Sequence, residues 1–307
     1  MRILITGASG FAGHYLLNYA RTQKATLAGI SRSRSLPDDV VCFSGDLLAP
    51  EVAAQAVCAF TPDVIFHLAA QTPANTPNSS PHNWLTNNPL ATYHLFEAVR
   101  HFAPQTRIVV VSSSAVYGHI GLNQLPITEE MPLQPATMYG VSKASQELVA
   151  QHYVQAYSMD IVRVRSFNLV GSGEPTGMIT SILASQVAAI IRGEREHIQI
   201  RHLLTKRDYT DIRDAVRAYW LLGEHGVSGQ VYNLCTGIAT SVSTVLDIIF
   251  AHAGLTAPVE ETDPHFGAND ILEQSGSSAR LQAATGWQPE ITLNQSLAEL
   301  LNSFESL

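Results

Sequence analysis

Short apolar runs alternate with longer segments of helical periodicity through the first half of the chain. The apolar runs predict strands at residues 2–5, 26–30, 40–44, 63–67, 108–111 and 161–164. The intervening segments predict helices from about residue 11 and at 51–60, 84–102 and 136–157. Nearly continuous apolar strands that alternate with helices are typical of a parallel sheet covered on both faces. The pattern therefore predicts a doubly wound α/β fold.

The pattern changes after residue 165. Residues 171–177 are rich in glycine and predict a loop, and a polar loop is expected to end at residues 206–209. Further helices are expected at 179–192, from 211, at 242–253 and at 294–304, with strands at 197–200 and 231–234. We expect residues 1–166 to form the doubly wound domain. Residues 167–307 should mainly form a smaller lobe, with some segments returning to the sheet, and a ligand should lie in the cleft between them.

Composition narrows the class of protein. The 307 residues carry a net charge of −8, which does not favour a nucleic-acid surface or an anionic membrane as a partner. We find neither a signal-peptide pattern nor an apolar run of membrane-spanning length, so we expect a cytoplasmic protein. The three cysteines lack metal or redox spacing. We therefore expect reduced thiols in the core and no metal site.

The first predicted strand leads into a glycine-rich turn. Gly7, Gly10 and Gly13 follow that strand directly and precede a predicted helix. Glycines at this spacing allow a tight turn and let backbone N–H groups approach a pyrophosphate at the helix N-terminus. An ordinary strand-to-helix turn would also fit the glycines alone. Because the turn follows the first strand of the chain, the sequence predicts a dinucleotide site.

The second predicted strand ends in a pattern that favours NADP over NAD. NAD sites usually offer an acidic residue here to the ribose 2′-hydroxyl. This chain has Ser31 and Arg32 instead, with Arg34 nearby. A guanidinium can bind a phosphate through two parallel hydrogen bonds. The alternative is a solvated surface arginine, and the missing acid is a second argument for a 2′-phosphate.

Tyr139 and Lys143 are four residues apart on a predicted helix and therefore share one face. An ammonium beside a phenol favours the phenolate, so the pair can move a proton at an alcohol or carbonyl oxygen. Ser112–Ser114 follow the predicted strand 108–111 and would reach the same cleft. Each feature alone also fits a surface helix or a strand-ending turn. Their order after the glycine turn predicts a catalytic constellation.

These features together resemble the short-chain dehydrogenase/reductase family, in its extended, nucleotide-sugar-modifying branch. The resemblance covers nearly the whole chain and extends to residues 67–70, Asn88 with Thr92, 165–171, 207–209 with Asp211 and Asp214, and 286–289. Within that branch, residues 207–222 and 231–237 are most similar to the GDP-4-keto-6-deoxy-mannose reductases. The resemblance implies a Rossmann domain, a substrate-binding lobe, NADP(H) as cofactor and a homodimer formed by the two long helices.

The resemblance also implies roles for individual residues. Tyr139 would protonate the substrate oxygen, Ser113 would hydrogen-bond it, and Lys143 would bind the nicotinamide ribose. Ser112 and Ser114 are less favoured as the catalytic hydroxyl, and Asn88 would support the lysine through water. Asp46 would accept from the adenine amino group, and Asn168 and Arg207 would hold the nucleotide sugar. The expected cofactor-binding residues are Gly7, Gly10, Phe11, Gly13, Ser31, Arg32, Asp46, Leu47, Leu68, Ala69, Ala70, Asn88, Tyr139 and Lys143.

The favoured function is NADPH-dependent reduction of the C4 ketone of a nucleotide-linked 4-keto-6-deoxy sugar, with GDP-4-keto-6-deoxy-mannose preferred. A nucleotide-sugar 4-epimerase is the main alternative. A 4,6-dehydratase is less favoured, because related dehydratases carry an acid where this chain has Ala115. A non-catalytic cofactor-binding regulator would not need the Ser113, Tyr139 and Lys143 set.

One departure concerns the substrate. Gly267 stands where relatives carry a second arginine for the diphosphate. Arg201, Lys206 or His265 would then replace it, or the substrate is not the usual GDP-sugar.

Overall fold

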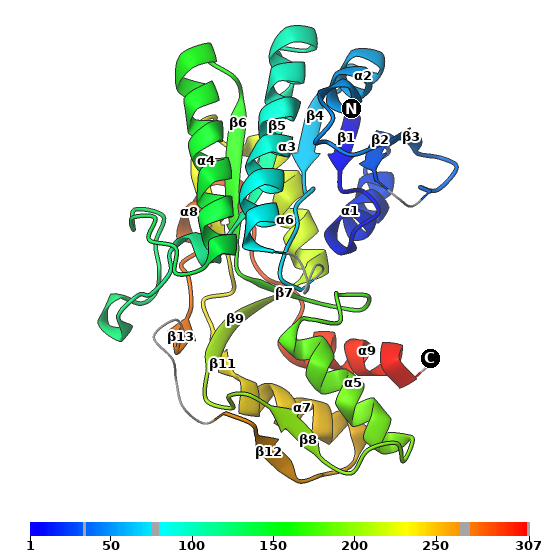
Figure 1. The fold of residues 1–307 in the computed structure, drawn as a ribbon, viewed down its shortest axis with the longest axis vertical. Coiled ribbons are helices and arrows are strands. Elements are labelled where there is room, and N and C mark those ends of the chain that lie inside the picture. Colours follow the sequence, from blue (N-terminus) through cyan, green and yellow to red (C-terminus); the bar gives the residue numbers. More distant parts are fainter. Residues whose placement is uncertain (33–34, 75–79, 264–270, 306–307) are drawn as a thin grey trace.

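The computed structural model describes residues 1–32, 35–74, 80–263 and 271–305. Its centre is a seven-stranded sheet in the order β10-β6-β5-β4-β1-β2-β3 (Figure 1). All neighbouring strands in this sheet are parallel. The strands are β1 (Arg2–Thr6), β2 (Thr26–Ser31), β3 (Val41–Ser44), β4 (Val64–His67), β5 (Arg107–Ser113), β6 (Ile161–Ser166) and β10 (Val231–Leu234). The predicted doubly wound α/β fold is confirmed.

Helices cover both faces of this sheet. On one face, α1 (Phe11–Thr22) and α6 (Ile212–His225) bury Ile3 and Ile5 of β1. On the other face, α2 (Pro50–Phe60), α3 (Pro81–Phe102) and α4 (Met138–Tyr157) bury Leu4. Successive side chains of β1 thus enter opposite cores, because side chains alternate along a strand. This two-sided burial explains why the strands read as continuous apolar runs.

The strand order reverses beside β1. The chain runs outward from β1 to β2 and β3, then returns to place β4 on the other side of β1. Ligands of open α/β sheets bind beyond the carboxyl ends of the strands at such a switch point. Two short 3₁₀ helices, η1 (Ser114–Val116) and η2 (Leu122–Gln124), follow β5 at this edge.

A smaller lobe lies beyond the same edge (Figure 1). Strands β7 (Asn168–Val170), β9 (Lys206–Asp211), β11 (Ala239–Ser241) and β13 (Glu273–Gln274) form one sheet, and β8 (Ile198–Ile200) pairs with β12 (Val259–Glu261). Helices α5 (Ile179–Ile191), α7 (Val242–Ala253) and α9 (Leu293–Glu305) share a core. By contrast, α6, α8 (Ala279–Thr285) and β10 pack with the large sheet. The division after residue 166 stays a prediction.

Two expectations from the sequence were wrong. The polar loop expected to end at residues 206–209 is interrupted by strand β9, which pairs with β7, β11 and β13. Its partners lie far away in the sequence, so local polarity concealed the strand. Of the three free cysteines only Cys235 is buried, whereas Cys42 on the edge strand β3 and Cys58 on α2 are exposed. Within the described residues, none of the helices combines the length and apolarity needed to cross a membrane.

Candidate functional site

A cleft of about 1320 Å³ runs along the carboxyl ends of the large sheet and continues into the small lobe. The glycine turn, Tyr139 and Lys143 line it from the large sheet. Asn168 and Arg207 line it from the lobe. The structure therefore brings the residues that the sequence singles out into one continuous space. No set of three or more His, Cys, Asp or Glu side chains in the described part of the chain is arranged to hold a metal ion.

The glycine turn depends on close approaches of backbone to backbone that side chains would block. Gly7 has φ +68°, and a Cβ there would lie 2.9 Å from the backbone of Ala69. A Cβ on Gly13 would lie 2.3 Å from the carbonyl oxygen of Gly7. Gly10 is the N-cap of α1, and Phe11 follows it in the first turn. The turn thus presents the N-terminus of α1 to the cleft, where its unpaired N–H groups favour an anion.

Arg32 and Ser31 differ in exposure at the end of β2. Arg32 lines the cleft, is 62% exposed, and places a guanidinium nitrogen 3.7 Å from the Asp46 carboxylate. Ser31 is buried and donates a hydrogen bond to Ser9 at 2.9 Å. Asp46 and Leu47 line the same end of the cleft. Arg32 is therefore the accessible cation here, while Arg34 lies outside the described residues.

Further predicted cofactor contacts line the middle of the cleft. Leu68, Ala69 and Ala70 follow β4 and line the cleft, and the backbone of Leu68 and Ala69 lies against Gly7. Asn88 accepts a hydrogen bond from the Gln71 backbone N–H at 2.8 Å and donates to Ser142 at 3.0 Å. It thereby links this segment to α4. The water-mediated support of Lys143 by Asn88 stays a prediction.

Tyr139 and Lys143 both lie in the first turns of α4, with Ser113 opposite them. Burial raises the pKa of Tyr139 to about 12, and a hydrogen bond with Ser113 opposes that rise. Burial lowers the pKa of Lys143 to about 8, and the negative charge of Glu147 opposes this decrease. The ammonium donates to the Val111 carbonyl oxygen at 2.8 Å. Tyr139 is therefore held as a protonated phenol, rather than the phenolate that the helix spacing favours.

The neighbouring serines have other partners, which distinguishes Ser113 from them. Ser112 donates to the buried Glu147 carboxylate at 2.6 Å, and Ser114 donates to Gln274 at 3.0 Å. The Ser113 hydroxyl accepts from the Ala115 N–H at 3.1 Å and still has its own proton to donate. Ser113 is thus the hydroxyl of the cluster that contacts Tyr139.

The sequence reasoning missed two pairs of side chains near this site, because it did not identify Glu147 and Tyr219 as partners. The Arg165 guanidinium and the Glu147 carboxylate form a fully buried ion pair at 2.8 Å, which ties β6 to α4. Glu147 follows Lys143 by one helical turn, and that spacing was the available signal. Ser166 and Tyr219 both line the cleft, with their hydroxyl oxygens 2.8 Å apart. Tyr219 comes from α6, so nothing local connects it to the site.

The lobe end of the cleft contains the predicted substrate residues. Asn168 donates to the Asp208 carbonyl oxygen at 3.3 Å, and Arg207 donates to the Lys206 carbonyl oxygen at 2.8 Å. Asp208 accepts from Thr236 instead of pairing with the adjacent Arg207. Arg201 also lines the cleft, whereas Lys206 pairs with Glu273 at 3.0 Å. His265 and Gly267 lie outside the described residues.

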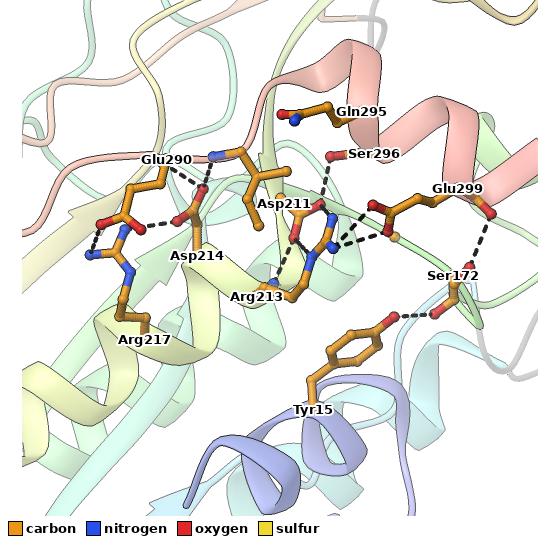
Figure 2. A network of polar contacts seen from close by, with 12 residues as sticks. Tyr15, Ser172, Asp211, Arg213, Asp214, Arg217, Glu290, Gln295, Ser296 and Glu299 are labelled. Atoms are coloured by element: carbon orange, nitrogen blue, oxygen red, sulfur yellow. Dashed lines mark hydrogen bonds and ion pairs between the residues drawn. The ribbon is translucent and has the colours of Figure 1, made fainter. Parts of the chain in front are cut away.

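The acidic residues Asp211 and Asp214 join α6 to the C-terminal segment of the chain and do not line the cleft (Figure 2). Asp211 caps α6 and binds Arg213. Asp214 pairs with Arg217 and accepts from the backbone N–H of Glu290 at 2.9 Å. Both carboxylates are therefore engaged by other partners and form no ion pair with Arg207.

Comparison with known proteins agrees with this geometry. The model of the GDP-mannose 4,6 dehydratase family matches residues 4–300. The chain belongs to this family. It is 30% identical to the GDP-6-deoxy-D-mannose reductase of Pseudomonas aeruginosa, over 99% of this chain and 97% of that one. It is also 26% identical to a UDP-glucose 4-epimerase of Mycolicibacterium smegmatis, over 100% of this chain and 99% of the relative.

A solved structure has the same fold. The structure of RMD from Pseudomonas aeruginosa complexed with NADPH superposes with a TM-score of 0.87 at 28% identity, covering 99% of each chain. Members of the family and these relatives include reductases, epimerases and dehydratases of nucleotide sugars. The resemblance found in the sequence is confirmed, and the chain is an enzyme of the nucleotide-sugar-modifying branch.

Proposed function

We propose that this enzyme uses NADPH to reduce the C4 ketone of a nucleotide-linked 4-keto-6-deoxy sugar, with GDP-4-keto-6-deoxy-mannose as the favoured substrate. The observation that carries the proposal is the meeting of Ser113, Tyr139 and Lys143 in one cleft, beside an alanine at position 115. The reductase activity named for the Pseudomonas relative supports it, as does the NADPH in the similar structure.

The residues present fit NADP(H). Gly7, Gly10 and Gly13 line the cleft at the N-terminus of α1, where a pyrophosphate would bind. Arg32 offers a guanidinium to the 2′-phosphate, and Asp46 lies beside it for the adenine. When bound, NADPH supplies the hydride. Leu47, Leu68, Ala69 and Ala70 would line its path toward Tyr139.

The protein side of the reaction is a proton transfer. Tyr139 is protonated at neutral pH and would give its proton to the C4 oxygen as hydride reaches the carbon, so that ketone, hydride and proton yield an alcohol. Ser113 would donate a hydrogen bond to the same oxygen. Lys143, largely protonated at neutral pH, would stabilise the tyrosinate that remains and hold the nicotinamide ribose.

Dehydration would need a base to remove the C5 proton, and the site offers none at the expected place. Ala115 has no exchangeable side-chain proton. The buried Glu147 is paired with Arg165, and Glu129 accepts from the Asn233 N–H at 2.8 Å. A 4-epimerase uses the same Ser113, Tyr139 and Lys143 set, and the mycobacterial relative keeps that alternative open. Arg32 favours the reductase, because it would select NADPH. A net reduction consumes NADPH, so the cofactor must be released and replaced after each turnover.

Cations from the lobe would bind the diphosphate. Arg207 and Arg201 both line that end of the cleft, and Asn168 and Ser166 line the same cleft. A guanidinium forms strong, bidentate hydrogen bonds with phosphate oxygens. Arg201 is 3.4 Å from Asp263, so a diphosphate would compete with that carboxylate.

The outer surfaces of α3 and α4 support a homodimer. The two helices lie side by side on one face of the sheet (Figure 1). They expose large apolar side chains, which include Leu90, Tyr93 and Leu148. We propose that these surfaces pair between two copies of the chain. Light scattering at micromolar concentration tests this proposal, and a monomer would contradict it.

The decisive experiment offers the enzyme NADPH and a panel of GDP-, dTDP-, UDP- and CDP-linked 4-keto-6-deoxy sugars. Oxidation of NADPH is followed by the loss of absorbance at the nicotinamide band. We expect oxidation with one nucleotide series, and with GDP before the others. No oxidation with any of them, together with interconversion of C4 epimers, would replace the reductase with the epimerase.

A further inference from the structure

A buried chain of hydrogen bonds connects Lys143 with the glycine turn. The Lys143 ammonium donates to the Gln146 side-chain oxygen at 2.8 Å, and the Gln146 amide nitrogen donates to the Thr92 hydroxyl at 2.6 Å. The His67 ring lies between Thr92, at 2.9 Å, and Thr6, at 2.7 Å. All five side chains are at least 97% buried. They come from α4, α3, β4 and β1, so the chain crosses the large domain beneath the cleft.

The donors and acceptors in this chain have a single consistent assignment. Thr92 donates to the Asn88 carbonyl oxygen at 2.9 Å, so it must accept from both Gln146 and His67. His67 therefore carries its proton on Nε2, and its Nδ1 accepts from Thr6. Thr6 in turn accepts from the Ala69 N–H at 3.1 Å. Because Gln146 must give its amide N–H to Thr92, its carbonyl oxygen is fixed toward Lys143.

We propose that Gln146, oriented by Thr92 and His67, is a positioning residue for Lys143. The Val111 carbonyl and the Gln146 amide oxygen occupy two of the three ammonium hydrogens. The third remains for the cleft, which Lys143 lines. Two neutral acceptors hold the ammonium in place without the full charge of a carboxylate. This inference rests on the proposed function of Lys143, but it can be tested on the titration of the lysine without any turnover.

Gln146 acts within a defined set of charges around Lys143. Glu147 on α4 favours the ammonium, and the carboxylate is shared with Arg165 of β6. Tyr139 on α4 is a neutral phenol. His67 on β4 is neutral, because burial and the nearby lysine lower its pKa to about 3. From α3, Asn88 and Thr92 contribute only uncharged groups. Loss of the Gln146 oxygen therefore removes one of the two neutral acceptors that hold the ammonium.

The test measures the titration of Lys143 without substrate or cofactor. The chain contains three lysines, Lys24, Lys143 and Lys206, so NMR of protein labelled at lysine Cε gives few signals to assign. Lys24→Arg and Lys206→Arg variants identify the remaining signal as Lys143. We expect Gln146→Leu to lower the pKa of Lys143 by about one pH unit. Gln146→Glu should raise it, because a carboxylate favours the ammonium.

Controls separate positioning from loss of structure. Ser145→Ala changes a neighbour that bonds within its own helix, and should leave the Lys143 titration unchanged. Thr92→Val frees the Gln146 amide without touching Lys143, and should move the pKa in the same direction as Gln146→Leu. Thermal unfolding tests whether each variant is folded. If Gln146→Leu does not fold, Thr92→Val takes its place in the comparison. The proposal is overturned if the pKa of Lys143 stays unchanged in Gln146→Glu and also in the folded variant of the pair Gln146→Leu and Thr92→Val. Failure to reduce any keto sugar would instead refute the proposed function alone.

Discussion

Ser296 of α9 donates a hydrogen bond to the Asp211 carboxylate at 2.6 Å, and so joins the last helix of the chain to the start of α6. Arg213 extends this link, because it binds Asp211 at 2.9 Å and Glu299 of α9 at 3.0 Å (Figure 2). Helix α6 packs on the large sheet and α9 on the small lobe. The contact therefore helps to fix the two walls of the cleft relative to each other.

Removing the Asp211 carboxylate should destabilise the protein. We expect Asp211→Ala to lower the free energy of unfolding by roughly 2–3 kcal/mol, because it loses the N-cap of α6 and the charge-assisted hydrogen bonds from Ser296 and Arg213. Ser296→Ala should cost about 1 kcal/mol. Urea unfolding measures both. Asp39→Ala is the matched control, since it breaks an ion pair with Arg21 at the surface and should change little. Equal losses at Asp211 and Asp39 would refute the role of this link.

The phenol of Tyr139 should be essential for turnover but not for cofactor binding. General acid catalysis contributes about 10²–10⁴-fold, so we expect Tyr139→Phe to lower kcat by at least 10²-fold. The ring remains, so the affinity for NADPH should hardly change. Steady-state kinetics and fluorescence titration measure the two quantities. Tyr157→Phe, at the far and exposed end of the same helix, should retain activity. Near-normal turnover of Tyr139→Phe would mean that another group supplies the proton.

Arg32 should discriminate between the two nicotinamide cofactors. Its guanidinium reaches the end of the cleft where a 2′-phosphate would lie, and a charge-assisted hydrogen bond contributes about 1.5–3 kcal/mol. Arg32→Ala should therefore weaken NADPH binding by about 10–100-fold. NADH binding should hardly change. Arg195→Ala removes an arginine outside the cleft lining and should affect neither cofactor. Equal losses for NADPH and NADH would exclude a 2′-phosphate contact.

Local signals made much of the fold and the centre of the site predictable. The glycine turn, the alternation of strands and helices, and the spacing of Tyr139 and Lys143 all lie within short stretches of sequence. Strand β9 could not be found in this way, because its partners β7, β11 and β13 come from distant segments. Its residues are polar, and Asp208 is buried through bonds to Thr236 and Gly237 that only the fold creates.

The chemical surroundings of the predicted residues also depend on the fold. The spacing of Tyr139 and Lys143 suggests a phenolate, yet burial keeps the phenol protonated and Gln146 holds the lysine. Gln146 belongs to no recognisable sequence motif, and Thr92 and His67, to which it is linked, lie on other elements, so its role could not be predicted from the sequence. Sequence patterns can indicate which side chains come together, but they do not indicate how far each side chain is desolvated. Desolvation in the fold is what shifts the pKa values of these groups.

His67 should make the enzyme lose stability as the pH falls below neutral. Burial lowers its pKa from 6.5 to about 3, so the folded state keeps it neutral where the unfolded chain binds a proton. The stabilisation is fully present above pH 6.5 and is lost as the pH falls toward 3, by about 1.4 kcal/mol per pH unit. At pH 5 the loss should reach about 2 kcal/mol.

The matched variant is His67→Gln, because a glutamine can accept from Thr6 and donate to Thr92 without titrating. Urea unfolding of wild type and variant is compared between pH 7 and pH 5, above the usual range of carboxylates. Other titrating groups are common to both proteins and cancel in the difference. We expect the wild type to lose about 2 kcal/mol more than His67→Gln over this interval. His14→Gln changes an exposed histidine and should keep the wild-type slope. If His67→Gln keeps that slope as well, His67 is not held neutral, and the direction assigned to its hydrogen bonds is wrong.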